Sequence, residues 1–229
     1  MQNINNDSFP HTPLPLSSSG WEQGLVLQDE WANTLTHGIG LFLSFIGLIF
    51  LIIAPLSSGD HWKLASVCIY GSTLVFLYFA STLYHCLKQP TLKQLFQKID
   101  HCAIYFLIAG SYTPFTMIAL KGFWGWLLLS IVWSLAFLGI LFKTFYIHRF
   151  KHISTFIYLA MGWLVLIAIE PLINSLTTEA LYWLFAGGLF YTGGVIFYVL
   201  DYKRFYHAIW HLFVMGGSAC HYIAILLYL

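Results

Sequence analysis

The chain has 229 residues, of which 59% are hydrophobic, 19% aromatic and only 8% charged, and its mean hydropathy is +0.76. This composition excludes an ordinary soluble domain and indicates an integral membrane protein. The net charge of +1 leaves no basic surface that could neutralise phosphates, so nucleic acid is excluded as a partner. The four cysteines show no CxxC pairing and lie in or beside apolar segments, so no disulfide framework is expected.

The chain divides into a polar start and a long apolar remainder. The start is rich in Asn, Ser and Pro, contains no Lys or Arg, and lacks the apolar core of a signal peptide. We expect a disordered polar tail over residues 1–24 and a single transmembrane domain over residues 25–229.

Seven apolar runs are long enough to cross a hydrocarbon core about 30 Å thick, which takes about 20 helical residues. They are continuously apolar, so helices are favoured over the alternating strands of a barrel. The prediction is an all-α, seven-transmembrane-helix bundle with spans at residues 33–54, 62–85, 99–120, 123–143, 153–170, 180–200 and 206–228. Pro114, inside the third span, predicts a kink that frees a backbone carbonyl for Ser111 or Thr113 to bond.

The basic residues predict the orientation of the bundle. If the amino terminus is cytoplasmic, the inner loops hold eight of the ten Lys and Arg residues, and the outer loops hold only Lys63 and Lys121. This distribution fits the positive-inside rule. The carboxyl terminus is then expected outside the cell.

Polar side chains inside membrane spans are costly and therefore mark candidate functional positions. They open the first, third and seventh spans and close the second, and they are Glu30, Asn33, His37, Ser81, His85, Asp100, His207 and His211. With the amino terminus inside, all of them fall near one membrane face although they come from four helices. This convergence favours a shared site over eight unrelated polar residues.

The HAIWH run at 207–211 contains two histidines four residues apart, which lie about 6 Å apart along a helix and can reach one metal ion. His85 is the best candidate for a third ligand because it lies at the same depth. Three histidines with water in the fourth position form the arrangement of a catalytic zinc. Such an ion lowers the pKa of its bound water toward about 7 and polarises a carbonyl group, which suits hydrolysis of an ester or amide.

Other polar residues are candidates for supporting this Zn²⁺ site. Asp100 could accept a proton from the water or orient it, or it could be an exposed carboxylate at a helix start. His37 could support the site or be a plain interfacial histidine. His221 lies about 15 Å deeper than His211, so it cannot share the ion, and buried hydrogen bonding is its expected role. The candidate supporting residues of the first span are Glu30, Asn33 and His37.

Three sequence blocks together resemble a known family. EWANTLTH at 30–37, STLYH at 81–85 with KID at 98–100, and HAIWH at 207–211 are similar to the blocks of the hemolysin III proteins, the bacterial branch of the progestin and adipoQ receptor family. The resemblance runs from Glu30 to the end of the chain. It implies a seven-helix bundle in the bacterial inner (plasma) membrane, with the amino terminus in the cytoplasm.

The resemblance also assigns roles to residues. His85, His207 and His211 match the zinc-ligand positions, and Asp100 and Ser81 match the polar residues beside the metal-bound water, which makes these two the candidate catalytic residues. The family is distantly related to alkaline ceramidases, and its receptor branch is associated with hydrolysis of ceramide-like lipid amides. Some bacterial members are associated with cytolysis, and others with membrane lipid and energy homeostasis.

These observations favour a zinc-dependent hydrolase of a lipid amide or ester, with membrane lipids as its partners and a role in membrane lipid homeostasis. One alternative is a non-enzymatic homeostasis or sensor protein with a structural zinc. Another is a cytolytic membrane protein, although the spans lack the amphipathic segments of a pore former. A transporter is less favoured because broken helices do not recur in two halves. Self-association into a homo-oligomer is left open.

Overall fold

The computed structural model describes residues 20–146 and 151–229, so most of the expected polar tail lies outside the described residues. Every regular element within these two ranges is helical. In chain order the elements are α1 (Gly20–Ser58), α2 (His61–Cys86), α3 (Pro90–Pro114), a π-helical turn (Phe115–Ala119), α4 (Phe123–Tyr146), α5 (Lys151–Gly162), a 3-10 turn (Leu164–Ala168), α6 (Ile169–Ser175), α7 (Thr178–Val199) and α8 (Tyr206–Tyr228).

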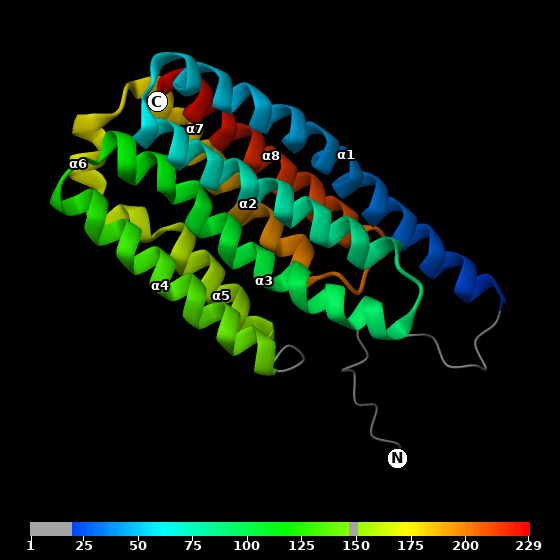
Figure 1. The fold of residues 1–229 in the computed structure, drawn as a ribbon. Helices are drawn as coiled ribbons and strands as arrows, with labels where there is room; N and C mark the ends of the chain where they lie inside the picture. The colour runs from blue at the N-terminus through cyan, green and yellow to red at the C-terminus, as the bar shows by residue number, and fades with distance from the viewer. Residues whose placement is uncertain (1–19, 147–150) are drawn as a thin grey trace.

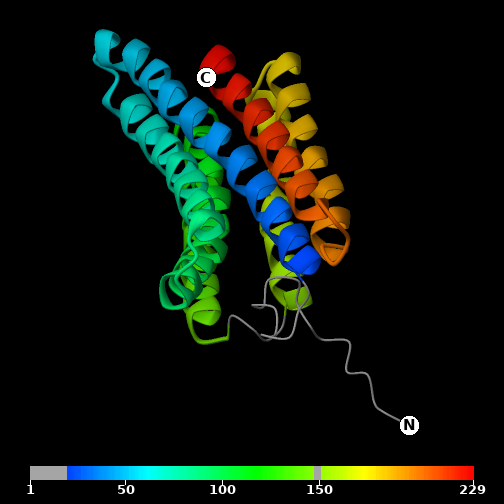
Figure 2. The same ribbon diagram turned by 90° about the vertical axis from the view of Figure 1, so that its right-hand side faces the viewer.

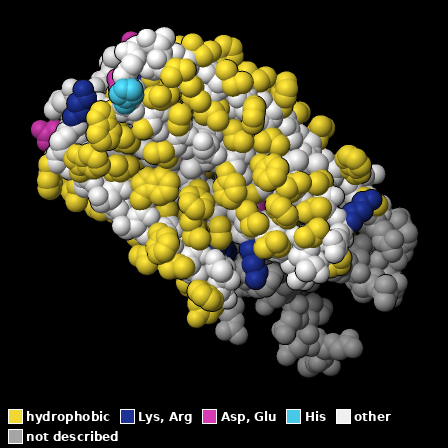
Figure 3. Space-filling model, viewed as in Figure 1, with side chains coloured by type: hydrophobic (Ala, Val, Ile, Leu, Met, Phe, Trp, Pro, Cys, Tyr) yellow, Lys and Arg dark blue, Asp and Glu magenta, His cyan; other side chains and the backbone are white. Residues whose placement is uncertain are grey.

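Seven helical segments of the described chain are long and apolar enough to cross a membrane. The predicted fold class is therefore confirmed, and the last span, Tyr206–Tyr228, has the predicted bounds. Helix α1 begins at Gly20 and so includes residues that were expected in the polar tail. The face of the molecule in Figure 3 is covered by hydrophobic side chains and carries its charged side chains at the two ends, as a lipid-facing surface requires.

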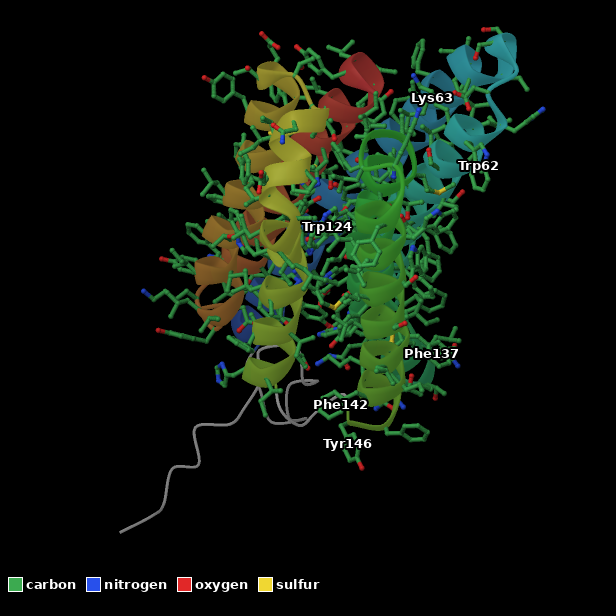
Figure 4. All side chains as sticks on the ribbon, turned by 90° about the vertical axis from the view of Figure 1, so that its left-hand side faces the viewer. Trp62, Lys63, Trp124, Phe137, Phe142 and Tyr146 are labelled. Atoms are coloured by element: carbon green, nitrogen blue, oxygen red, sulfur yellow. The ribbon has the colours of Figure 1, made fainter. Side chains whose placement is uncertain are left out.

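The helices pack as an antiparallel bundle in which α1 lies against both α2 and α8 (Figures 1 and 2). Helices α1, α3 and α8 begin at one end of the bundle, where α2 also ends. We call this the histidine end. Figure 4 shows Trp62 and Lys63 at the opposite end of the bundle from Phe142 and Tyr146. Which end faces the cytoplasm remains a prediction from the distribution of basic residues.

The third span changes its helical form at Pro114, where the sequence predicts a kink. Five residues, Phe115–Ala119, continue the span as a π-helical turn. The hydroxyl groups of Ser111 and Thr113 do not bond the carbonyl that a proline frees four residues earlier. They donate instead to the carbonyls of Ile108 at 2.8 Å and Ala109 at 2.9 Å, as serine and threonine side chains commonly do inside membrane helices.

The fifth span is broken near its middle, which the sequence analysis did not predict. Helix α5 ends at Gly162, and a 3-10 turn leads into α6. The buried hydroxyl of Tyr112 bonds this break, because it accepts from the N–H of Val165 at 2.9 Å and lies 2.9 Å from the carbonyl oxygen of Met161. A single side chain thus satisfies backbone groups that would otherwise be exposed at membrane depth.

Two apolar clusters hold the bundle together. One joins α1, α2, α3 and α8, and the other joins α3, α4, α5 and α6. Close helix approach depends on small residues, as is usual in membranes. A Cβ atom at Gly187 on α7 would lie 2.3 Å from Cδ2 of His221 on α8, so only glycine allows this contact. This packing fixes α8, which carries two of the three converging histidines described below.

Candidate metal centre

Three histidines from two helices converge at the histidine end. One nitrogen from each of His85, His207 and His211 lies within 4.8 Å of the others, a spacing that could hold one metal ion. His85 and His211 are buried, and His207 is half-buried. His85 is the second-last residue of α2, and the four-residue spacing places His207 and His211 on one face of α8. The sequence predicted this grouping.

The residue that precedes α8 has an unusual backbone conformation. Phe205, the residue before the helix, has φ 60° and ψ 0°, which is the left-handed region that a bulky residue rarely adopts. The preceding Arg204 contacts α1, where its guanidinium donates to Gln28 and its Nε lies 3.6 Å from Oδ1 of Asp29. These contacts tie the start of α8 to α1 and so position His207, three residues after Arg204.

A carboxylate on α1 orients the first histidine. Oε2 of Glu30 lies 2.8 Å from Nδ1 of His85. A carboxylate only accepts hydrogen bonds, so Nδ1 of His85 carries the hydrogen and donates it. In the neutral ring the lone pair then belongs to Nε2, which is the nitrogen available to a metal. A carboxylate, a histidine and a metal in this order form the usual support of a metal-ligating imidazole.

A threonine orients a second histidine in the same way. Oγ1 of Thr36 lies 3.0 Å from Nδ1 of His211, and it also lies 2.9 Å from the carbonyl oxygen of Ala32 and 3.0 Å from that of Asn33. In the tautomer that carries the hydrogen on Nδ1 of His211, Thr36 donates its single hydrogen to one of these carbonyls and accepts from Nδ1. Nε2 of His211 is therefore also left as a ligand atom. Thr36 was not among the predicted site residues.

Three further predicted residues are buried polar groups at this end of the bundle. Asn33, His37 and Ser81 are no more than 3% exposed, and none of their side-chain nitrogen or oxygen atoms has a hydrogen-bond partner in the described parts of the chain. The His37 ring stacks on His211 with 3.4 Å between centroids. Buried polar groups are normally satisfied. Their presence therefore fits a site that takes polar ligands.

Asp100 lies on α3 at the same end of the bundle. Its Oδ2 is 3.6 Å from Nδ1 of His101. Two aromatic rings at this end lie beside the histidines. Between ring centroids, Tyr84 lies 4.5 Å from His85 and Tyr198 lies 6.5 Å from His207. Neither tyrosine was singled out in the sequence.

Lys93, which the sequence analysis counted only as a basic residue of an inner loop, also belongs to this network. Its Nζ lies 3.2 Å from Oε1 of Glu30 and donates to the carbonyl of Tyr84 at 3.0 Å. Glu30 thus lies between Lys93 and His85. No spacing pattern in the sequence pairs a lysine on α3 with a glutamate on α1, so this contact could not be predicted from the sequence.

An apolar cavity extends from this region between α3, α5, α7 and α8. Its space, counted with the open mouth, is about 1150 Å³. Tyr198 and Trp210 line it near the histidine end, and Phe115 and His221 line it deeper in the bundle. His221 bonds the carbonyl oxygen of Leu184 through Nε2 at 3.2 Å, which confirms the expected buried hydrogen bond.

The fold and site define a seven-helix membrane protein with a three-histidine candidate metal centre at one end of the bundle. The family model described as "Haemolysin-III related" matches residues 25–222. The chain belongs to this family, as its sequence blocks predicted. Seven membrane-length helices in a family with bacterial members also agree with the predicted multi-pass protein of the inner membrane.

Curated relatives match over most of their length. The chain is 48% identical to "Hemolysin-3 homolog" of Bacillus subtilis (strain 168), over 88% of this chain and 95% of that protein. It is 46% identical to "Hemolysin-3" of Bacillus cereus, over 88% of this chain and 92% of that protein. A more distant relative is "Monocyte to macrophage differentiation factor" of Homo sapiens, 33% identical over 86% of this chain and 83% of that protein.

Proposed function

We propose that this protein is a zinc-dependent hydrolase that cleaves an amide or ester bond in a membrane lipid. The observation that carries the proposal is the convergence of His85, His207 and His211 within 4.8 Å. An apolar cavity begins near this cluster, since Tyr198, which lines the cavity, lies 6.5 Å from His207 between ring centroids. The histidine end also holds polar side chains that suit hydrolysis.

The donor set fits zinc. Within the described residues the cluster has three imidazoles, no thiolate and no fourth protein ligand. Such a set is typical of a catalytic zinc site, whereas structural sites are usually closed by four protein ligands. Glu30 and Thr36 leave Nε2 of His85 and of His211 as the donor atoms. When bound, zinc would supply Lewis acidity toward a carbonyl oxygen and make water more acidic.

The polar side chains at the histidine end supply the remaining roles. Asp100 is the candidate general base, because a carboxylate on the α3 side of the cluster can take a proton from water and return it to the leaving group. Ser81, one helical turn before His85, can hold water or a carbonyl oxygen by a hydrogen bond. Asn33 offers an amide N–H₂ to the same oxygen, and His37 supports the His211 ring by stacking on it.

The apolar cavity is suited to the acyl chain of the substrate. It is lined almost entirely by aliphatic and aromatic side chains, and Tyr198 and Trp210 bring its wall to the histidines. Apolar cavities of this kind commonly hold small lipophilic ligands. A lipid bound there would have its polar linkage at the histidine end and its chain inside the bundle.

The test is lipid hydrolysis by the purified, zinc-loaded protein against a panel of ceramides, N-acyl amides and lysophospholipid esters. We expect turnover of at least one class and its loss in His207→Ala. His61→Ala, which removes an exposed histidine outside the cluster, is the matched control and should retain turnover. Hydrolysis by a correctly folded His207→Ala variant at the wild-type rate would refute the proposal.

A cytolytic function is the second candidate, because a relative from Bacillus cereus carries the name "Hemolysin-3". Dye release from liposomes containing the purified protein would support it. A protein that holds zinc, releases no dye and cleaves none of the panel would instead support the non-enzymatic homeostasis or sensor role.

A further inference from the structure

A second groove opens at the histidine end, between α1 and the connection from α2 to α3. We call it the α1–α3 groove, and its space, counted with the open mouth, is about 1120 Å³. The groove is lined by residues of α1, α2 and α3, including His85. Helices α5, α7 and α8, which help to form the apolar cavity, contribute no residue to it. Val26, Leu27 and Trp31 of α1 form one wall, and Lys88, Lys93 and Gln94 belong to the other.

The charges of the groove are unbalanced. Glu30 is the acidic residue among those that line it, and it contacts both Lys93 and His85. Lys88 is exposed and has no ion-pair partner in the described residues. Gln94 and Gln97 add amide groups that can donate hydrogen bonds. The groove therefore offers a cationic group, with neutral donors beside it, to a ligand that carries negative charge.

The opposite wall is apolar and exposed. Trp31 is 72% exposed and Leu27 is 48% exposed, and both lie in the first membrane-length segment. Lys88 lies in the connection after α2 ends at Cys86. The groove thus pairs an apolar wall on α1 with a lysine just beyond the end of α2. A phospholipid likewise joins apolar acyl chains to a charged phosphate.

We propose that the α1–α3 groove binds an anionic phospholipid from the surrounding leaflet. Its phosphate lies against Lys88, within reach of Lys93, and an acyl chain covers Leu27 and Trp31. Lys93 contacts Glu30, and Glu30 contacts His85. The Lys93–Glu30 ion pair therefore lies between the bound phosphate and the candidate metal centre. The proposal goes beyond lipid hydrolysis and does not depend on it.

Tryptophan quenching by brominated lipids tests this directly. Wild-type protein is placed in phosphatidylcholine nanodiscs that contain the same mole fraction of either dibrominated phosphatidylglycerol or dibrominated phosphatidylcholine. The Trp31 contribution is the part of the quenching that disappears in Trp31→Phe. We expect the anionic lipid to quench Trp31 at an apparent affinity about fivefold higher than the neutral lipid, the effect of about one lysine at a membrane surface.

The variants locate the phosphate. Lys88→Gln should abolish the preference, Lys88→Arg should keep it, and Lys98→Gln, an exposed lysine of α3 outside the groove, should also keep it. The preference should persist in His207→Ala, which separates lipid binding from hydrolysis. Adding inorganic phosphate should not reduce the quenching, whereas relief by free phosphate would show that the site reads a soluble anion and would overturn the lipid assignment. Equal quenching by the two lipids, or an unchanged preference in Lys88→Gln, would also overturn it.

Discussion

The carboxylate of Glu30 on α1 and the imidazole of His85 on α2 are joined by a 2.8 Å contact between Oε2 and Nδ1, although 55 residues separate them in the chain. This contact fixes which His85 nitrogen carries the hydrogen. It also explains why a charged residue is kept inside the first membrane-length segment, where an isolated carboxylate would be costly. Removing the charge should therefore weaken metal binding without removing a ligand.

Glu30→Gln is expected to lower zinc affinity about tenfold or more, the usual effect of removing a carboxylate that supports a metal-ligating histidine. The affinity is measured by competition with a chromogenic chelator. Glu179→Gln, at an exposed position in the first turn of α7, is the control and should bind zinc like wild type. An unchanged affinity in Glu30→Gln would contradict the role assigned to the Glu30 carboxylate.

Thr36→Val keeps the shape of the side chain and removes the oxygen that accepts from His211. We expect zinc affinity to fall, by less than in Glu30→Gln, because the lost partner is neutral. The matched control is Thr34→Val, since Thr34 is also half-buried on α1 and, among the described residues, its hydroxyl bonds only the backbone carbonyl of Glu30. Chelator competition again gives the affinity. Equal affinities for the two valine variants would contradict the role assigned to Thr36.

Val195→Trp places a large side chain in the wall of the apolar cavity. If the cavity holds the acyl chain, hydrolysis of long-chain substrates should fall about tenfold or more while zinc content is unchanged, because overfilling removes the chain's binding site. Val199→Trp, one turn farther along α7 at a position 38% exposed, is the control. A Val195→Trp variant that cleaves long-chain lipid as fast as the control would place the chain elsewhere.

Tyr112→Phe removes the hydroxyl that bonds the break between α5 and α6. The buried N–H of Val165 loses its acceptor, and this should lower the free energy of unfolding by about 1–3 kcal/mol. The change is read as a lower midpoint of thermal denaturation in detergent. Tyr182→Phe, at a position 72% exposed, should leave the midpoint unchanged. If the two variants have the same midpoint of thermal denaturation, contacts other than the Tyr112 hydroxyl stabilise the break.

The number and order of the spans could be predicted from the sequence, because the length needed to cross lipid and the absence of charge over that length are visible in composition alone. The bounds of α8 were predicted correctly for this reason. The break after Gly162 was not predicted, since residues 156–169 around it carry no charged or strongly polar side chain. Its backbone groups are satisfied by Tyr112, a residue of another helix, and hydropathy carries no information about such a contact.

The same distinction holds for the site. The sequence predicted that His85, His207 and His211 would converge, because helix direction alone determines which polar residues share a membrane face. Thr36 and Lys93 were missed, because their contacts depend on how α1 is rotated against α8 and on how far a lysine side chain reaches. Rotation and reach depend on packing, which spacing along one helix does not specify.

The central claim is that His85, His207 and His211 together hold zinc, and metal analysis of the purified protein tests it most directly. The protein is purified without added metal or a histidine tag, and its zinc is measured by mass spectrometry. We expect about one zinc per chain in wild type and in His61→Ala, as for a three-histidine site, and almost none in His85→Ala, His207→Ala or His211→Ala. Wild-type protein without zinc, or folded cluster variants that retain it in full, would contradict the claim.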